Sequence, residues 1–215
     1  MKANPRTIWL ASYPRSGNTL LRTVLWQCFA LRSGSVYRED LGGNTELENY
    51  VGHIEHSVDG AIHFPKGNLP LVKTHGPPVD DDPSIYIVRD GRAAAVSLWH
   101  FYRERIPLEA IIEGHHRFGT WSSHLTVWRP WERPNTLLLR YEDIATDLSH
   151  ALTKISIFLE RDILAERISD RDTVADIDGQ WVRRKSSWEE VLSNSLLERF
   201  NEINGEMMQK LGYSS

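Results

Sequence analysis

Three short polar segments of this chain combine residue types that bind anions or transfer protons. The first, residues 13–19, reads Tyr-Pro-Arg-Ser-Gly-Asn-Thr and stands between a β-rich apolar run and a helical pattern. Gly17 lets the backbone approach a ligand closely, successive N–H groups at a helix start favour an anion, and Arg15 adds a positive charge. The same residues would also serve as an ordinary helix N-cap, and the segment alone leaves the two interpretations level.

The other two segments add a possible base and a second anion site. In Lys73-Thr74-His75, histidine can act as a general base, and the lysine projects to the same side of an extended strand. A single histidine at a strand end is more often structural, and its lysine neighbour shifts the balance. Arg89 ends a further strand and Ser97 lies two turns into the next helix, so together they could bind a phosphate. Otherwise Arg89 pairs with Asp90 on the surface and Ser97 faces the sheet.

These segments need a scaffold that brings strand ends together. Apolar runs predict strands at 7–12, 69–73, 84–88 and 136–141. Helical spacing predicts helices from residue 19 to about 29, over 92–103, after Pro107, over 115–128, after an Asp147 or Ser149 cap, and over 188–211. The glycine-rich stretch 33–68 predicts loops with one short helix near 45–51. We therefore expect one domain over residues 1–215, a three-layer α/β/α fold with a mostly parallel sheet, whose strand ends form the site.

Composition narrows the function classes. The chain has 25 Lys plus Arg against 29 Asp plus Glu, a net charge of −4, which argues against nonspecific nucleic-acid binding. A hydrophobic share of 40% excludes a disordered chain, and one cysteine excludes an intramolecular disulfide framework. No apolar run approaches the roughly 18 residues of a membrane span, and the first residues lack a signal peptide's apolar region, so we expect a cytoplasmic location.

A metal site is not expected. His53, His56 and His63 lie in a glycine-punctuated stretch without helical ligand spacing or a strong carboxylate partner. We expect these histidines to be exposed to solvent or to line a pocket.

The polar segments, taken in order, resemble those of the cytosolic-type sulfotransferases that use 3′-phosphoadenosine 5′-phosphosulfate (PAPS). Residues 13–19 resemble the 5′-phosphosulfate loop Y-P-K-S-G-T-T, residues 73–75 the K-T-H element, and residues 88–101 the 3′-phosphate segment. Residues 139–143 resemble the F-Y-E-D strand end, and residues 121–128 resemble the W-x-x-H helix. The five elements follow the family's order between residue 7 and about residue 160.

The resemblance implies a P-loop-like sulfotransferase fold and transfer of a sulfuryl group from PAPS to a hydroxyl, or an amine, of a small-molecule, lipid or sugar acceptor, without a metal. His75 would be the general base, and Arg15 and Lys73 would stabilise charge on the bridging and leaving oxygens. The implied donor-binding residues are Arg15, Ser16, Gly17, Asn18 and Thr19 at the 5′-phosphate, Arg89 and Ser97 at the 3′-phosphate, Tyr141 near the adenine, and the triplet Arg183, Arg184 and Lys185.

The chain also departs from the family pattern. Arg15 replaces a lysine, Asn18 replaces a threonine, and Leu20 stands where many members have an adenine-stacking tryptophan. The R-K-G-x-x-G-x-W signature is reduced to residues 183–188 without its glycines, so any of the three basic residues could contact the 3′-phosphate. Two alternatives remain: a non-catalytic nucleotide-binding protein, and an atypical P-loop kinase, which the missing G-x-x-x-x-G-K-[ST] spacing disfavours.

Overall fold

In the described part of the chain, five parallel strands form one sheet at the centre of the molecule. The computed structural model describes residues 6–169, 173, 176–177 and 187–213. The strands are β1 (Ile8–Ala11), β2 (Ser33–Ser35), β3 (Leu71–Thr74), β4 (Ser84–Val88) and β5 (Thr136–Arg140). Their order is β2-β3-β1-β4-β5, and every pairing is parallel. The mostly parallel sheet is thus confirmed, with one strand more than the four predicted.

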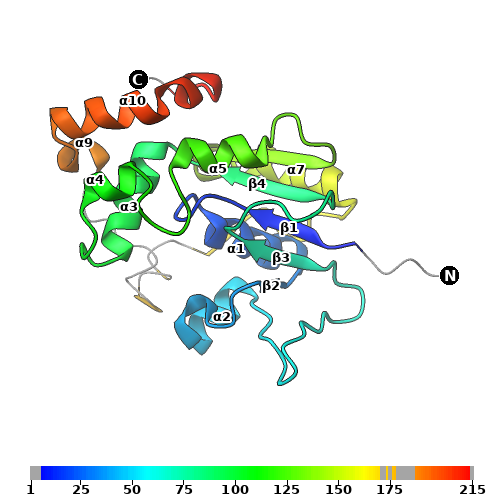
Figure 1. Ribbon diagram of the computed structural model, residues 1–215. Coiled ribbons are helices and arrows are strands. Elements are labelled where there is room, and N and C mark those ends of the chain that lie inside the picture. The colour runs from blue at the N-terminus through cyan, green and yellow to red at the C-terminus, as the bar shows by residue number, and fades with distance from the viewer. Residues whose placement is uncertain (1–5, 170–172, 174–175, 178–186, 214–215) are drawn as a thin grey trace.

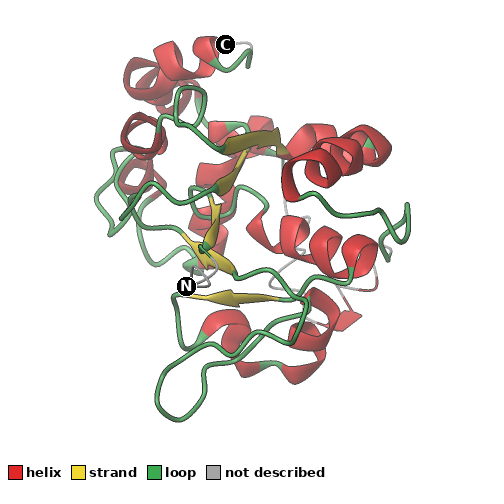
Figure 2. Ribbon diagram, turned by 90° about the vertical axis from the view of Figure 1, so that its right-hand side faces the viewer, coloured by secondary structure: helices red, strands yellow, loops and turns green. Residues whose placement is uncertain are grey.

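Helices cover both faces of this sheet (Figure 1, Figure 2). On one face, α1 (Asn18–Phe29) and α7 (Leu148–Leu159) pack over Leu10, Ile85 and Ile87. On the other, α3 (Gly91–Phe101), α5 (Trp121–Trp128) and α10 (Asn194–Lys210) pack over Tyr86 and Val88. Successive residues of β4 thus point to opposite faces, as strand geometry requires, and the predicted three layers are confirmed.

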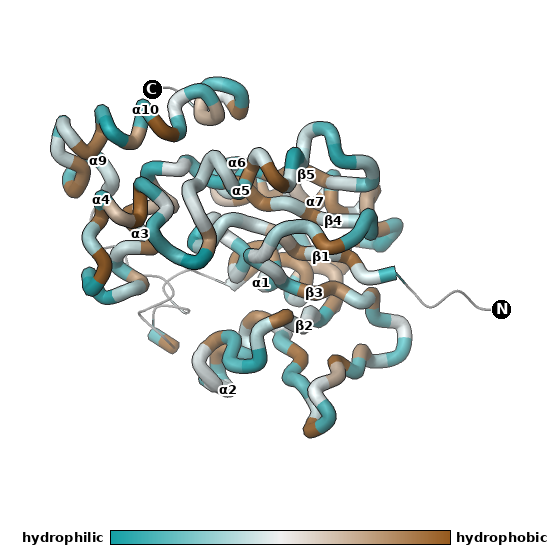
Figure 3. Tube along the Cα trace, viewed as in Figure 1, coloured by the Kyte–Doolittle hydropathy of each residue, from teal (hydrophilic) through white to brown (hydrophobic). Residues whose placement is uncertain are grey.

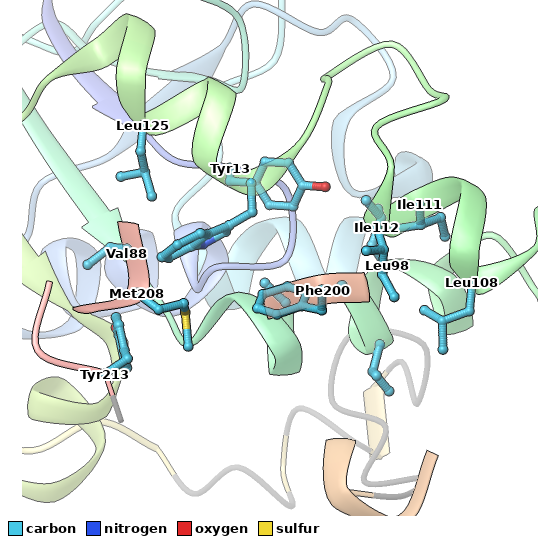
Figure 4. Packing of buried hydrophobic residues seen from close by; sticks show 14 of the residues in the cluster. Tyr13, Val88, Leu98, Leu108, Ile111, Ile112, Leu125, Phe200, Met208 and Tyr213 are labelled. Atoms are coloured by element: carbon cyan, nitrogen blue, oxygen red, sulfur yellow. The ribbon is translucent and has the colours of Figure 1, made fainter. Parts of the chain in front are cut away.

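The second of these cores joins segments far apart in the chain. Figure 4 shows Tyr13 from the loop after β1 in the same cluster as Leu125 of α5 and Phe200 of α10. Phe200, Asn204 and Met208 recur every four residues on the buried side of α10. Short hydrophobic and hydrophilic stretches follow one another along this helix (Figure 3), as expected for a helix with one buried side.

The edge strand β2 lies in a stretch predicted to be loop. Its sequence, Ser-Gly-Ser, has no apolar alternation to signal a strand. It pairs with β3, and Gly34 fits against Ile62 so closely that a Cβ atom would lie 2.8 Å from that side chain. The predicted short helix is confirmed as α2 (Thr45–Val51), and a 3₁₀ turn, η1 (Asp40–Gly43), precedes it.

The helix predicted over 115–128 is wrong in its first half. The segment after Pro107 forms α4 (Leu108–Ile112), and α5 begins only at Trp121. Gly119 has φ 69°, and the Thr120 side chain accepts a 3.0 Å hydrogen bond from the Ser123 N–H, so the backbone turns before the helix starts.

The helix predicted over 188–211 is two helices, α9 (Trp188–Val191) and α10. Ser193 caps α10 by accepting a 3.3 Å hydrogen bond from the Leu196 N–H, which fixes the break between them. The strand predicted to reach residue 141 ends at Arg140, where α6 (Tyr141–Thr146) begins. The Asp147 cap of α7 is confirmed, with a 3.0 Å bond from the His150 N–H.

Among the described helices, none is both long enough and apolar enough to cross a bilayer.

Candidate functional site

The loop after β1 forms an open helix N-terminus. The N-cap of α1 is Gly17, which has φ 105° and no side chain to cap the helix, so the capping-only interpretation of this loop is wrong. The first N–H groups of a helix have no partner within it and favour an anion. A Cβ atom on Gly17 would lie 2.6 Å from Cδ2 of Tyr141, so both the backbone angle and the ring require glycine here.

Ser16 and Asn18 are buried beside this helix start. The Asn18 side-chain nitrogen donates 2.8 Å to the Leu10 carbonyl and 3.3 Å to Ser12 Oγ, which ties the loop to β1. Ser16 Oγ and Asn18 Oδ1 are buried without a hydrogen-bond partner in the described part of the chain. Because buried polar atoms are normally paired, the loop is suited to a polar ligand.

Arg15, Arg89 and Ser97 meet at the same end of the sheet. Arg15 Nε donates a 3.2 Å hydrogen bond to Ser97 Oγ, and Arg89 Nη1 donates 3.3 Å to the Arg15 carbonyl. Burial and the neighbouring Arg89 lower the pKa of Arg15 to about 10, which leaves it charged at neutral pH. The Arg89 guanidinium lies 4.5 Å from the ring centroid of Tyr141. Arg15 and Arg89, from two strand ends, therefore form one cationic cluster, which Ser97 and Tyr141 contact.

His75 has a defined tautomer. Its Nδ1 lies 2.8 Å from the carbonyl oxygen of Ser12, which can only accept, so Nδ1 carries the proton and Nε2 keeps its lone pair. Burial and the charge of Lys73 hold the pKa of His75 well below its ordinary value of 6.5. The imidazole is thus neutral at physiological pH, in the form a general base needs.

The backbone of His75 is held from two sides. Its N–H donates 3.0 Å to the Tyr37 hydroxyl, and its carbonyl accepts from His124 Nε2 at 3.0 Å. His124 Nδ1 in turn lies 2.7 Å from the Tyr86 hydroxyl, and burial lowers the pKa of His124 to about 4. Trp128 is buried, and its Nε1 donates 2.9 Å to the Gly76 carbonyl.

Aromatic rings surround the imidazole. Tyr37 stacks on His75 with ring centroids 5.9 Å apart, and Phe118 meets its edge at 5.9 Å. His116 lies next to Phe118, with centroids 6.2 Å apart, and its Nε2 is 3.1 Å from the Tyr13 hydroxyl. These rings form an aromatic wall beside the base, and the Arg117 guanidinium lies 5.4 Å from the Tyr37 ring centroid and 5.1 Å from that of Phe118.

Lys73 is buried and ion-paired. Its Nζ lies 2.5 Å from Asp40 Oδ1, and burial lowers its pKa to about 8 although Asp40 acts in the opposite direction. Asp40 and its second partner, Arg22, were not predicted. The sequence did contain one signal, which is that Arg22 stands among the apolar residues of α1, between Leu21 and Thr23-Val24.

The three loop histidines do not form a metal site. His53 is buried rather than exposed or pocket-lining, and its Nδ1 lies 2.7 Å from Arg22 Nη2. Burial lowers the pKa of His53 to about 4, so the ring accepts from the guanidinium. Within the described residues, no group of three or more His, Cys, Asp or Glu side chains gathers to hold a metal.

Four of the predicted site residues remain, one on α1 and three in the triplet 183–185. Thr19 is in the first turn of α1, whereas Arg183, Arg184 and Lys185 lie outside the described residues. Two surface cavities of about 380 and 480 Å³ contain none of the predicted site residues and play no part in this site.

Comparisons with known proteins point to one family. The sequence model of the "Sulfotransferase domain" family matches residues 5–178. Human sulfotransferase 1E1 is 28% identical over 182 residues, which cover 74% of this chain and 61% of the human protein. Rabbit (Oryctolagus cuniculus) amine sulfotransferase is 27% identical over 129 residues, 55% of this chain and 43% of that protein. The chain thus spans at most about three fifths of these relatives.

Solved structures agree on the fold. Mouse sulfotransferase SULT7A1 complexed with PAP covers 96% of this chain and 86% of its own, with a TM-score of 0.62 and 21% identity. Retinol dehydratase in a complex with retinol and PAP covers 100% of this chain and 84% of its own, with a TM-score of 0.67 and 20% identity. The predicted fold family is confirmed.

Proposed function

Since this chain belongs to the sulfotransferase domain family, we propose that it transfers a sulfuryl group from PAPS to a hydroxyl, or an amine, of a small-molecule acceptor. The observation that carries the proposal is the pairing of a neutral His75, with a free Nε2, and the cationic cluster of Arg15 and Arg89 at the same sheet edge. A proton acceptor beside an anion-binding loop is the arrangement that group transfer from a phosphorylated donor requires.

The donor-binding residues of this chain fit a molecule with phosphate groups at two ends. The N–H groups at the start of α1 and the unpartnered Ser16 hydroxyl would bind the 5′-phosphate. Arg89 and Ser97 would bind the 3′-phosphate, with the triplet 183–185 proposed as a further contact. Tyr141, which packs on Gly17 and Arg89, would lie near the adenine.

PAPS supplies an activated sulfuryl group whose bridging bond to the 5′-phosphate breaks as the bond to the acceptor oxygen forms. In that step His75 Nε2 takes the acceptor's proton, while Nδ1 stays bonded to the Ser12 carbonyl. Arg15 and Lys73 stabilise the negative charge on the bridging and leaving oxygens. The products are the sulfated acceptor and 3′,5′-adenosine bisphosphate (PAP). None of these roles calls for a metal.

We propose that the acceptor is aromatic or otherwise flat, because aromatic rings surround His75. Tyr37 and Phe118 contact the His75 ring from its face and its edge, so an aromatic or other flat acceptor would present its hydroxyl between them. A solved structure of the same fold, retinol dehydratase, holds retinol. We also propose a cytoplasmic location, on the resemblance to cytosolic-type members.

The test is sulfuryl transfer from ³⁵S-labelled PAPS by the purified protein to panels of phenols, alcohols and amines, and to fractionated cell extract. We expect a labelled product whose formation requires His75. PAP binding without transfer to any fraction would instead indicate a non-catalytic nucleotide-binding protein. Thermal stabilisation by ATP–Mg²⁺ and not by PAP would indicate a kinase.

A further inference from the structure

A buried cluster of charges lies behind Lys73. The Asp40 carboxylate bridges two cations, with Oδ1 2.5 Å from Lys73 Nζ and Oδ2 2.5 Å from Arg22 Nη1. Arg22 is 0% exposed, Lys73 5% and Asp40 6%. Such a bridge fixes both cations because its geometry leaves the carboxylate little freedom.

Arg22 is itself held in place by other residues, whereas Lys73, the other partner of Asp40, has the proposed role in sulfuryl transfer. Its Nε donates 2.8 Å to Ser33 Oγ, and Nη2 lies 2.7 Å from His53 Nδ1. Asp40 comes from η1, Arg22 from α1 and Lys73 from β3, so three elements meet at this carboxylate. The Lys73 ammonium also lies 5.7 Å from the centroid of Tyr37, the ring that stacks on His75.

Most of the surroundings of Lys73 disfavour its charged form. Burial comes first in lowering its pKa, and Arg22 and Arg15 lower it further; Asp40 alone among the described groups that act on it favours the ammonium. His53 adds no charge because its pKa is about 4, and His75 is likewise neutral. Glu48 stands next to Arg22 and Asp40 rather than to Lys73. Removing Asp40 would therefore leave a buried amine beside two guanidinium groups.

We propose that Asp40 is a positioning residue for sulfuryl transfer, which ties the Lys73 side chain to Arg22 and keeps it in its charged form beside the leaving oxygens. The proposal rests on the role given to Lys73 in the proposed function. Asp40, which would thus influence the reaction, lies between β2 and α2, outside the motifs proposed to bind the donor.

The first test measures Lys73 directly and needs no acceptor. The chain has six lysines, so ¹³Cε-lysine labelling gives few signals, and Lys73→Arg identifies the one from Lys73. We expect the wild-type midpoint near pH 8. Asp40→Asn should lower it by about 1–3 pH units, the effect of losing a close opposite charge. Arg22→Gln should raise it, since a like charge is lost.

The second test follows the pH dependence of kcat. In Asp40→Asn the alkaline limb should move to lower pH together with the Lys73 midpoint, and lowering the pH should restore much of the lost rate. The affinity for PAP at that lower pH should stay within about twofold, since the N–H groups of α1 and Arg89 are untouched. A purely structural role predicts a lower melting temperature and a rate reduced equally at every pH.

Each outcome decides between named possibilities. An unchanged Lys73 midpoint in folded Asp40→Asn overturns the proposal. If Asp40→Asn does not fold, two other variants decide instead, Arg22→Gln and the charge-retaining Asp40→Glu. A Lys73 titration midpoint that falls in either of these variants contradicts the proposal. If the midpoints move as expected but the wild-type protein transfers no sulfuryl group to any acceptor, the proposed function fails while the Asp40–Lys73 coupling stands.

Discussion

The Nε atom of Arg15 donates a 3.2 Å hydrogen bond to Oγ of Ser97 and so joins the loop after β1 to the middle of α3. The two residues lie 82 positions apart in the chain. Arg89 completes the group through its bond to the Arg15 carbonyl. A ligand that spans these three residues would contact the ends of β1 and β4 at once.

Arg89→Ala should remove the preference for a 3′-phosphate. Charge-assisted hydrogen bonds contribute roughly 1.5–3 kcal/mol each, so wild-type protein should bind PAP at least about tenfold more tightly than 5′-AMP. In Arg89→Ala the two affinities should approach each other, whereas replacing the exposed Arg105 by alanine should leave both unchanged. Isothermal calorimetry measures all of them, and equal wild-type affinities would refute the assignment.

His75→Ala should lower turnover by a factor on the order of 10²–10⁴, because the general base is lost, with PAP affinity kept within about twofold. On the acid side, the activity of the wild-type protein should fall as the pH drops through the lowered pKa of His75, so the acid limb should lie below pH 6.5. The measurements are kcat against pH, calorimetry with PAP and the melting temperature. A variant that melts normally and turns over at the wild-type rate would show that His75 is structural.

Acid should destabilise the fold well before its carboxylates titrate. His53 and His124 have pKa values of about 4 in the folded chain against an ordinary 6.5, so the unfolded chain takes up protons first as the pH falls. Their stabilising effect is complete above pH 6.5 and is lost down to about pH 4. In that window each histidine should change the free energy of unfolding by about 1.4 kcal/mol per pH unit.

Urea unfolding at pH 7, 6 and 5 measures this slope, and His124→Asn provides the comparison. An asparagine cannot be protonated in this range, so the variant should show a slope smaller by one histidine. The same slope in both proteins would mean that His124 is charged in the folded state.

Gly17→Ala should destabilise the chain by about 1–3 kcal/mol, because alanine is strained at φ 105° and its Cβ would overlap the Tyr141 ring. Combining it with Tyr141→Ala removes the overlap and not the strain, so the two changes should cost less together than the sum of their separate effects. Gly205→Ala is the control: it lies within α10 with 4.0 Å to the nearest side-chain atom, and should stabilise by about 0.5–1 kcal/mol. Additive effects for Gly17 and Tyr141 would argue against their contact.

The parts of the fold that the sequence could predict are those encoded by neighbouring residues. Ile85 to Val88 form a continuous apolar run, so both the buried strand and the position of Arg89 at its end follow from it. The polar segments could be assigned to one site because the carboxyl ends of parallel strands share an edge. In contrast, β2 depends on a partner strand and on Ile62 filling the space at Gly34, neither of which Ser-Gly-Ser signals.

The bridge at Asp40 could not be predicted for a related reason. Its carboxylate meets Arg22, 18 positions earlier, and Lys73, 33 positions later, and only the folded chain brings them together. In the sequence, an aspartate two residues before a pair of glycines is typical of a turn. The helix that begins at Trp121 was predicted to begin at residue 115 because the apolar spacing runs through Gly119 without interruption. The positive φ of Gly119, which interrupts the helical backbone, is not visible in that spacing.

The atom that fixes the tautomer of His75 belongs to the main chain. Every amino acid has a carbonyl group, so substitution at position 12 can alter the 3.2 Å contact of the Ser12 hydroxyl without removing the 2.8 Å bond to its carbonyl. The orientation of this histidine is therefore inherited with the path of the backbone rather than with a neighbouring side chain. Substitutions at position 12, whether natural or designed, can therefore leave the tautomer and orientation of His75 unchanged.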